Sequence, residues 1–177
     1  MKTLLATAFA ALTLATPAQA ELSPRLKAEA RAWSAAFTQA GVRFVNSKSC
    51  PPDMAAQYEP GNRTITVCVN NVRTLDFYRE SVAHEAIHAA QHCVGRRLGV
   101  NTMLPLHTMV AETDPELAYK WQLAVNEAVA GKGDALAQSK SFNSRGITAP
   151  LEREAYAVES QNDFALKLFR AACLSGR

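Results

Sequence analysis

Four cysteines constrain the fold of this chain more than any other feature of its sequence. Cys50, Cys68, Cys93 and Cys173 form an even set, and no two of them have the Cys-x-x-Cys spacing of common cysteine zinc sites. Four cysteines allow three pairings. We favour Cys50–Cys68, which would tie a loop to the following strand, and Cys93–Cys173, which would join the C-terminal helix to a long central helix. In the chain-entropy description, a link across about 80 residues would stabilise the fold by roughly 4 kcal/mol.

The N-terminal segment indicates the oxidising compartment in which such disulfides form. Lys2 precedes a short apolar stretch, and Ala18-Gln19-Ala20 has the small residues of a signal-peptidase site. The apolar stretch is too short to span a bilayer. We therefore expect residues 1–20 to be a signal peptide and residues 21–177 to be a single domain that is secreted or periplasmic, with no membrane anchor after cleavage.

The charge pattern of the chain argues against nucleic-acid binding. Lysines and arginines number 19 and acidic residues 16, which leaves a formal net charge of +3. The charges are interspersed, and no basic stripe alternates with aromatic residues. We therefore expect no nucleic-acid partner, and we expect the protein itself to be a monomer.

Hydrophobic periodicity predicts an α+β fold that is mostly helical. Helical spacing and capping signals predict four helices, at residues 24–39, 75–97, 115–130 and 149–174. Short β-branched runs predict strands at residues 42–45 and 63–69, and the segments 46–60 and 131–146 have the composition of loops. We therefore expect a small sheet of two or three strands before the helix at 75–97.

The strand at residues 64–69 has two possible roles. Its alternating side chains would suit a strand with a free edge, to which an extended peptide could add as a further strand. The same alternation would equally suit an ordinary half-buried strand.

The helix at residues 75–97 carries the sequence His84-Glu85-Ala86-Ile87-His88. Side chains four residues apart lie on one face of a helix, so His84 and His88 can direct both imidazoles to one point. Two such imidazoles are typical ligands of Zn²⁺, and Glu85 can reach a water molecule bound to the same ion. The pattern predicts a zinc site in which Glu85 acts as the general base.

A zinc site of this kind needs a third protein ligand. The metzincin pattern would require a glycine and a histidine where this chain has Gln91 and Val94, so that class is excluded. The segment Glu152-Arg153-Glu154-Ala155 resembles the gluzincin family of zinc metallopeptidases, in which a glutamate on a later helix completes an HExxH site. This resemblance implies a zincin-like domain with Glu152 as the third ligand and Glu154 as the alternative. Either glutamate could instead be a solvated charge on the helix face.

Several further residues are candidates for smaller roles near such a site. His92 lies one more helical turn after His88, too far along the axis for direct ligation, and suits a structural role. His107 or Tyr156 could donate a hydrogen bond to an oxyanion, although each also suits a structural role. Helical spacing places Glu159 or Asp163 where a carboxylate could orient a ligating histidine.

The residues themselves predict an exported zinc site with a positioned base. The resemblance to the gluzincins implies that the protein is a hydrolase, a zinc-dependent metallopeptidase that cleaves a peptide or protein substrate. The alternative is a non-catalytic exported module that either binds zinc or is stabilised by its disulfides alone. The presence of Glu85 favours the enzyme, because a purely structural zinc site needs no base at that position.

Overall fold

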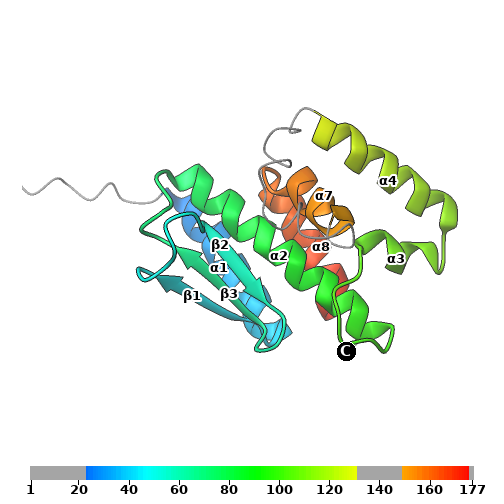
Figure 1. The fold of residues 1–177 in the computed structure, drawn as a ribbon, viewed down its shortest axis with the longest axis horizontal. Coiled ribbons are helices and arrows are strands. Elements are labelled where there is room, and N and C mark those ends of the chain that lie inside the picture. Colours follow the sequence, from blue (N-terminus) through cyan, green and yellow to red (C-terminus); the bar gives the residue numbers. More distant parts are fainter. Residues whose placement is uncertain (1–22, 131–148, 176–177) are drawn as a thin grey trace, which may run out of the picture.

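The structure is a computed structural model that describes residues 23–130 and 149–175. The expected signal peptide at residues 1–20 and the expected loop at residues 131–146 lie outside the described residues. In the described part, helices pack around and beside one small sheet (Figure 1). This is the mostly helical α+β fold that the sequence predicted.

The sheet has three strands, β1 (Arg43–Ser47), β2 (Ala56–Glu59) and β3 (Thr64–Cys68), in the order β1-β3-β2. β3 runs parallel to β1 and antiparallel to β2, so both of its edges are paired. Its side chains at Ile65 and Val67 are fully buried. The interpretation of this strand as a free edge for a peptide is therefore wrong, because its backbone hydrogen bonds are already used within the sheet.

β2 lies within the segment 46–60 that we expected to be a loop. The segment contains three prolines, and β2 itself has only four residues, of which Tyr58 alone is buried. The strand exists because it pairs with β3, and this long-range contact outweighs weak local propensity.

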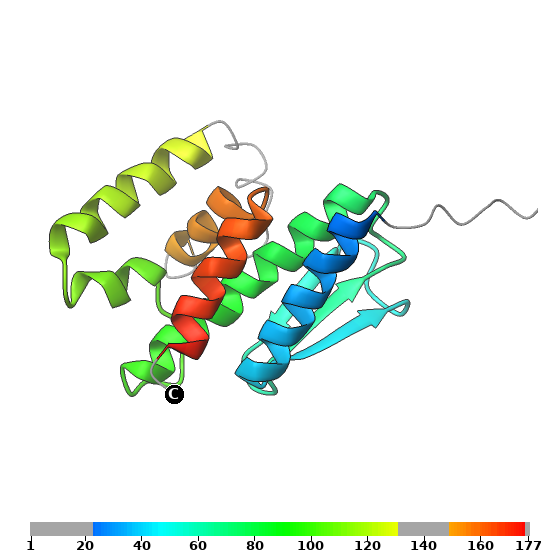
Figure 2. The ribbon, with the colours of Figure 1, turned by 180° about the vertical axis from the view of Figure 1, so that it is seen from behind.

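The helix α2 (Leu75–Arg97) is the central element of the fold. The sheet lies on one side of it and the two C-terminal helices lie on the other (Figure 1). Seen from behind, α8 runs across α2, with α1 beside it against the sheet (Figure 2). The other helices are α1 (Pro24–Ala40), α3 (Leu106–Ala111), α4 (Pro115–Ala130), α7 (Ala149–Val158) and α8 (Asn162–Leu174).

The predicted boundaries of α2 are confirmed by its capping contacts. Thr74 precedes the helix, and its hydroxyl oxygen accepts a hydrogen bond from the backbone N–H of Phe77 at 3.1 Å. Gly99 follows the helix with a φ of +78°, a left-handed conformation that glycine adopts without steric cost. The helix is therefore long enough to carry the HExxH sequence well inside its ends.

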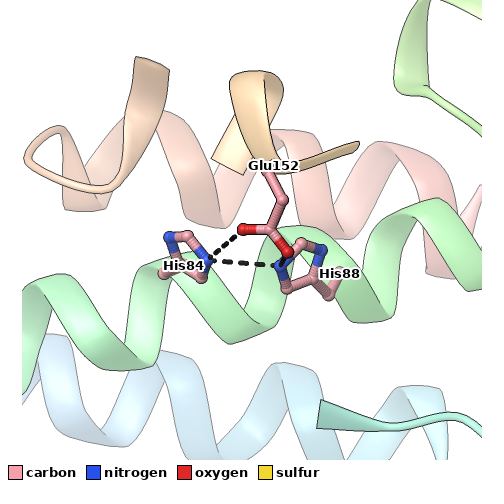
Figure 3. Close-up of side chains that lie close together, drawn as sticks. All are labelled: His84, His88 and Glu152. Carbon is pink, nitrogen blue, oxygen red and sulfur yellow. Dashed lines mark hydrogen bonds and ion pairs between the residues drawn. The ribbon is translucent and has the colours of Figure 1, made fainter. Parts of the chain in front are cut away.

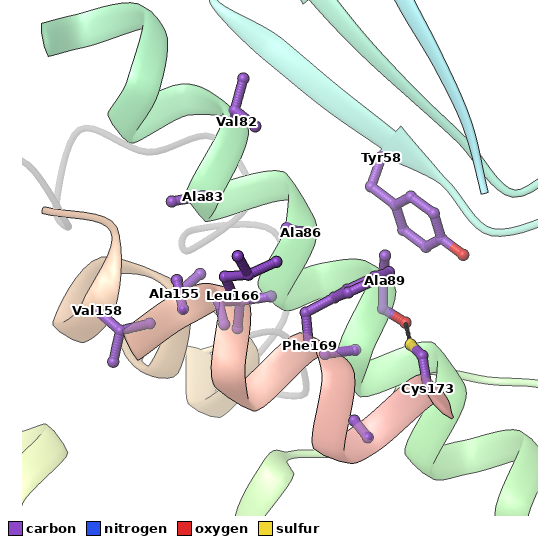
Figure 4. Close-up of a cluster of buried hydrophobic side chains, with 14 of the residues drawn as sticks. Tyr58, Val82, Ala83, Ala86, Ala89, Ala155, Val158, Leu166, Phe169 and Cys173 are labelled. Carbon is purple, nitrogen blue, oxygen red and sulfur yellow. Dashed lines mark hydrogen bonds between the residues drawn. The ribbon is translucent and has the colours of Figure 1, made fainter. Parts of the chain in front are cut away.

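Small side chains allow α2 and α8 to pack closely (Figure 4). Ala83, Ala86 and Ala89 of α2 are fully buried, and the side chains of Leu166 and Phe169 from α8 pack into the same core. Phe169 is also fully buried, so its replacement by alanine would cost about 3 to 5 kcal/mol. This core holds the C-terminal helices rigidly against the histidine-bearing helix.

Both predicted disulfides are confirmed. Cys93–Cys173 joins α2 to α8 across 80 residues, and Cys50–Cys68 joins the segment before β2 to the end of β3. Two disulfides fit an oxidising compartment. In residues 23–130 and 149–175, no helix is both long and apolar enough to cross a membrane.

Candidate metal centre

Two histidines one helical turn apart on α2 form the base of the candidate centre. The Nε2 atoms of His84 and His88 are 3.2 Å apart (Figure 3). Both residues lie in the middle of the helix, where regular backbone geometry places side chains four apart on the same face. The two rings therefore present one nitrogen each to a common point.

Glu152 brings a carboxylate to this point from α7 (Figure 3). Its Oε2 lies 3.4 Å from Nε2 of His84, and its Oε1 lies 3.6 Å from Nε2 of His88. The neighbouring side chains Leu151 and Ala155 are buried, which anchors the first turns of α7. Residues 64 positions apart in the chain thus meet because α7 packs against α2.

The three side chains lie close enough together to hold one metal ion. Ligand bonds of about 2.0 to 2.1 Å in tetrahedral geometry imply separations of roughly 3.4 Å between neighbouring ligand atoms. The two Nε2 atoms are 3.2 Å apart, and the two oxygens of Glu152 each lie near one of them, Oε2 at 3.4 Å from His84 and Oε1 at 3.6 Å from His88. One potential ligand atom from each of the three residues lies within 4.8 Å of the other two. His84, His88 and Glu152 are the group of potential ligands that the structure brings together, and they could bind a metal ion.

The second nitrogen of each histidine also has a partner. Nδ1 of His84 lies 3.0 Å from Oε2 of Glu159, and Nδ1 of His88 lies 2.8 Å from Oε1 of Gln91. If each Nδ1 donates its proton to these oxygens, each Nε2 keeps a lone pair for a metal. Among the described residues, no hydrogen bond or ion pair joins His84 to Asp163, the other predicted orienting residue.

Glu154 holds Gln91 in the orientation that His88 requires. The Nε2 of Gln91 donates to Glu154 at 3.0 Å and to the carbonyl of Leu151 at 2.9 Å. Since the amide nitrogen is engaged there, the amide oxygen must face His88, and Nδ1 of His88 must be the donor. The hydrogen-bond network therefore specifies both the amide orientation and the histidine tautomer.

The carboxylate of Glu154 is itself deeply buried, and both of its oxygens accept hydrogen bonds. It is 2% exposed and accepts hydrogen bonds from the backbone N–H groups of Leu106 and His107. It also accepts from Nε1 of Trp121 at 3.0 Å and lies 3.1 Å from Nδ1 of His107. The structure thus places Glu154, the alternative third ligand, in this network and away from the cluster of His84, His88 and Glu152.

Glu85 lies beside the cluster without being part of it. Its side chain is 7% exposed, and no hydrogen bond or ion pair joins it to another described residue. Its charge is near enough to contribute to the raised pKa of His84. A mostly buried carboxylate beside two histidines is well placed to exchange a proton with a bound water molecule.

The electrostatics of the metal-free centre favour a proton on His84. Burial disfavours the charged imidazolium, but hydrogen bonds to Glu152 and Glu159 outweigh it and raise the pKa of His84 to about 10. Burial also raises the pKa of Glu152, but its contacts with the two histidines outweigh this and hold that pKa far below its usual range. Without a metal, His84 is thus a charged imidazolium that forms ion pairs with the carboxylates of Glu152 and Glu159.

The remaining candidates each have a defined contact in the structure. Nδ1 of His92 lies 2.8 Å from the hydroxyl of Tyr58, so this histidine links α2 to the sheet. His107 contacts Glu154, and the ring of Tyr156 packs edge-on against His84 with centroids 4.7 Å apart. Gln91 was not predicted as part of the centre, although its position three residues after His88 on the same helix could have indicated it.

Comparison of the chain with models of protein families, with curated proteins and with solved structures found no match.

Proposed function

We propose that this protein is an exported gluzincin-type zinc metallopeptidase. The observation that carries the proposal is the meeting of His84, His88 and Glu152, whose potential ligand atoms lie within 4.8 Å of one another, with the Glu85 carboxylate beside them. Two imidazoles and one carboxylate form a donor set that suits zinc and leaves a fourth position open for water. Export is supported by the two disulfides together with the N-terminal sequence.

Each residue of the centre would have a distinct role in peptide hydrolysis. A bound zinc ion supplies Lewis acidity, which lowers the pKa of water toward 7 and polarises a peptide carbonyl. His84, His88 and Glu152 hold the ion, while Glu159 and Gln91 orient the two imidazoles. Glu85 accepts a proton from the attacking water and donates it to the nitrogen of the breaking C–N bond.

A non-catalytic zinc module is the competing function. A structural site closes its fourth position with another protein ligand. Here the described residues offer three ligands, and Glu85 is a carboxylate with no hydrogen bond or ion pair among those residues. A carboxylate that lies beside three potential metal ligands, with no partner of its own among the described residues, suits proton exchange with a bound water molecule better than a structural role.

The test compares the zinc-loaded protein with its Glu85→Gln variant on a library of internally quenched peptides. We expect the parent protein to cleave members of the library. The variant should retain zinc while its kcat/KM falls by at least about a hundredfold, the usual contribution of a general base. Glu116→Gln, an exposed glutamate on α4, is the matched control and should retain activity.

Two results would contradict the proposal. Equal hydrolysis by the parent and by Glu85→Gln would exclude the proposed base. Zinc retention without cleavage of any peptide by the parent protein would favour the non-catalytic module.

A further inference from the structure

A cavity lies between α3, α4 and α7, at the end of the molecule away from the sheet (Figure 1). It has a volume of about 460 Å³, within the range of small-molecule sites. Its wall includes Glu154, which follows the potential metal ligand Glu152 by two residues on α7. Two residues correspond to about 200° of rotation around a helix, so the cavity and the candidate metal centre face different sides of α7.

Much of the cavity wall is aromatic or apolar. Trp121 and Val125 line it from α4, and Pro105 and Pro150 line it at the starts of α3 and α7. Such a wall favours the aromatic body of a ligand, because an aromatic ring removes apolar area from water and can pack against an indole ring.

His107, which also lines the cavity, has one ring nitrogen without a partner. Its Nδ1 lies 3.1 Å from the carboxylate of Glu154, which accepts hydrogen bonds, so Nδ1 carries the proton and the neutral ring keeps a lone pair on Nε2. Nε2 has no hydrogen-bond partner in the described part of the chain. The buried side-chain atoms without a partner there are Nε1 of Trp33 and Oδ1 of Asn162, so Nε2 of His107 is not buried and is accessible to solvent. The cavity wall therefore offers an accessible hydrogen-bond acceptor.

The two charged residues of the described wall, Arg153 and Glu154, have opposite signs. The carboxylate of Glu154 accepts hydrogen bonds from the backbone N–H of Leu106 and from Nε1 of Trp121. Arg153 donates to Oδ1 of Asn126 at 2.8 Å. With a neutral His107, this wall has no net formal charge, so an uncharged ligand fits it best.

We propose that this cavity binds a small uncharged phenol, whose ring packs against Trp121 and whose hydroxyl donates a hydrogen bond to Nε2 of His107. A phenolic hydroxyl is a better donor than an aliphatic one, because the ring stabilises the charge that donation leaves on the oxygen. The site is separate from the proposed peptidase activity, because the residues that line it do not include the three potential metal ligands.

The test uses 4-methylphenol as the probe and the indole N–H signals of the purified protein in ¹H–¹⁵N NMR spectra. At pH 8 an ordinary imidazole is neutral and a phenol keeps its proton. The chain has two tryptophans, so one substitution, Trp33→Phe, assigns both signals. We expect 4-methylphenol to shift the Trp121 signal saturably. The signal of Trp33, which lies in α1 and does not line this cavity, should stay in place and serves as the internal control.

The contribution of the hydroxyl is tested with two further ligands and one variant. 4-Methylanisole keeps the ring and the oxygen but lacks the O–H, so its dissociation constant should be about two- to tenfold higher, as expected for one hydrogen bond. 4-Methylbenzoate is an anion and should also bind more weakly than the phenol, because the carboxylate of Glu154 lies beside His107. His107→Phe keeps a ring but removes Nε2, so the phenol and the ether should then bind equally. Glu116→Gln, an exposed glutamate of α4 outside the cavity, should leave the preference for the phenol unchanged.

Four outcomes would overturn the proposal. The first is a Trp121 signal that does not saturate up to the solubility limit of 4-methylphenol. The second is equal affinity of the parent protein for the phenol and the ether, which would mean that the hydroxyl donates to no group of the wall. The third is an undiminished preference for the phenol in His107→Phe, which would place that contact on another residue. The fourth is tighter binding of 4-methylbenzoate than of 4-methylphenol, which would mean that the wall selects an anion.

Discussion

Raising the pH of the metal-free protein should leave His84 protonated until the pH approaches 10. The cause is the pair of carboxylates on either side of the ring, with Glu152 at 3.4 Å from Nε2 and Glu159 at 3.0 Å from Nδ1. A free histidine would lose its proton near pH 6.5. At pH 8, His84 should therefore be almost fully protonated, whereas an unperturbed histidine would be about 3% protonated.

The variant Glu159→Gln measures how much one of these carboxylates contributes to the raised pKa of His84. Loss of a hydrogen bond to a charged group is worth about 1.5 kcal/mol, which corresponds to a fall of about one pH unit in the pKa of His84. Asp163→Asn is the matched control, since no contact joins Asp163 to His84 among the described residues, and it should leave this pKa unchanged.

The assay is an NMR titration of the histidine side-chain signals in protein freed of metal with a chelator. The four histidines give few signals, and a His84→Asn variant assigns the relevant one. A midpoint near 6.5 for His84 in the folded protein would refute the described arrangement of the carboxylates. Equal midpoints for the parent and Glu159→Gln would refute the role of Glu159 alone.

The raised pKa of His84 also makes the free energy of unfolding of the metal-free protein depend on pH. The pKa of His84 is higher in the folded than in the unfolded chain, so proton binding favours folding. This contribution is complete below about pH 6.5 and is lost as the pH rises through about 10. A metal ion must displace that proton, so its apparent affinity should rise about tenfold per pH unit below this pKa.

Two further predictions concern the supports of the centre and of the fold. Gln91→Met removes the acceptor for Nδ1 of His88 and should weaken zinc binding about 10- to 100-fold, as measured by competition with a chelating dye; unchanged affinity would show that Gln91 does not orient this ligand. Replacing both Cys93 and Cys173 with alanine opens a link across 80 residues and should lower the free energy of unfolding by about 4 to 5 kcal/mol in urea titrations. A loss below about 1 kcal/mol would mean that the packing of α2 against α8 suffices without the bond.

The parts of the fold that local signals determine were predicted well. α2 begins after Thr74 and ends before Gly99, because a side-chain cap and a left-handed glycine act within a few residues of the helix. The pairing of Cys93 with Cys173 was predicted because a bond between them would join the C-terminal helix to the long central helix. The structure has that bond.

The parts that depend on long-range packing were missed. β2 is a four-residue strand that exists through its pairing with β3, and α3 has six residues and no side-chain cap. The helix expected at residues 149–174 is interrupted between Val158 and Asn162, and this break places Glu159 beside His84. None of these features leaves a clear periodic signal in the sequence.

The residues of the candidate centre also differ in how far the sequence could predict them. His84 and His88 follow from helical spacing within one element, and the structure brings their nitrogens together. The distinction between Glu152 and Glu154 could not be made from spacing alone. It depends on the network of Leu106, His107, Trp121 and Gln91 around Glu154, to which distant parts of the chain contribute.

The central claim is that one metal ion lies between the side chains of α2 and α7. The most direct test is a crystal structure of the zinc-loaded protein with anomalous diffraction recorded at the zinc edge. We expect one anomalous peak about 2.0 to 2.2 Å from Nε2 of His84, Nε2 of His88 and a carboxylate oxygen of Glu152. A peak only at other side chains, or no peak within bonding distance of these three, would contradict it.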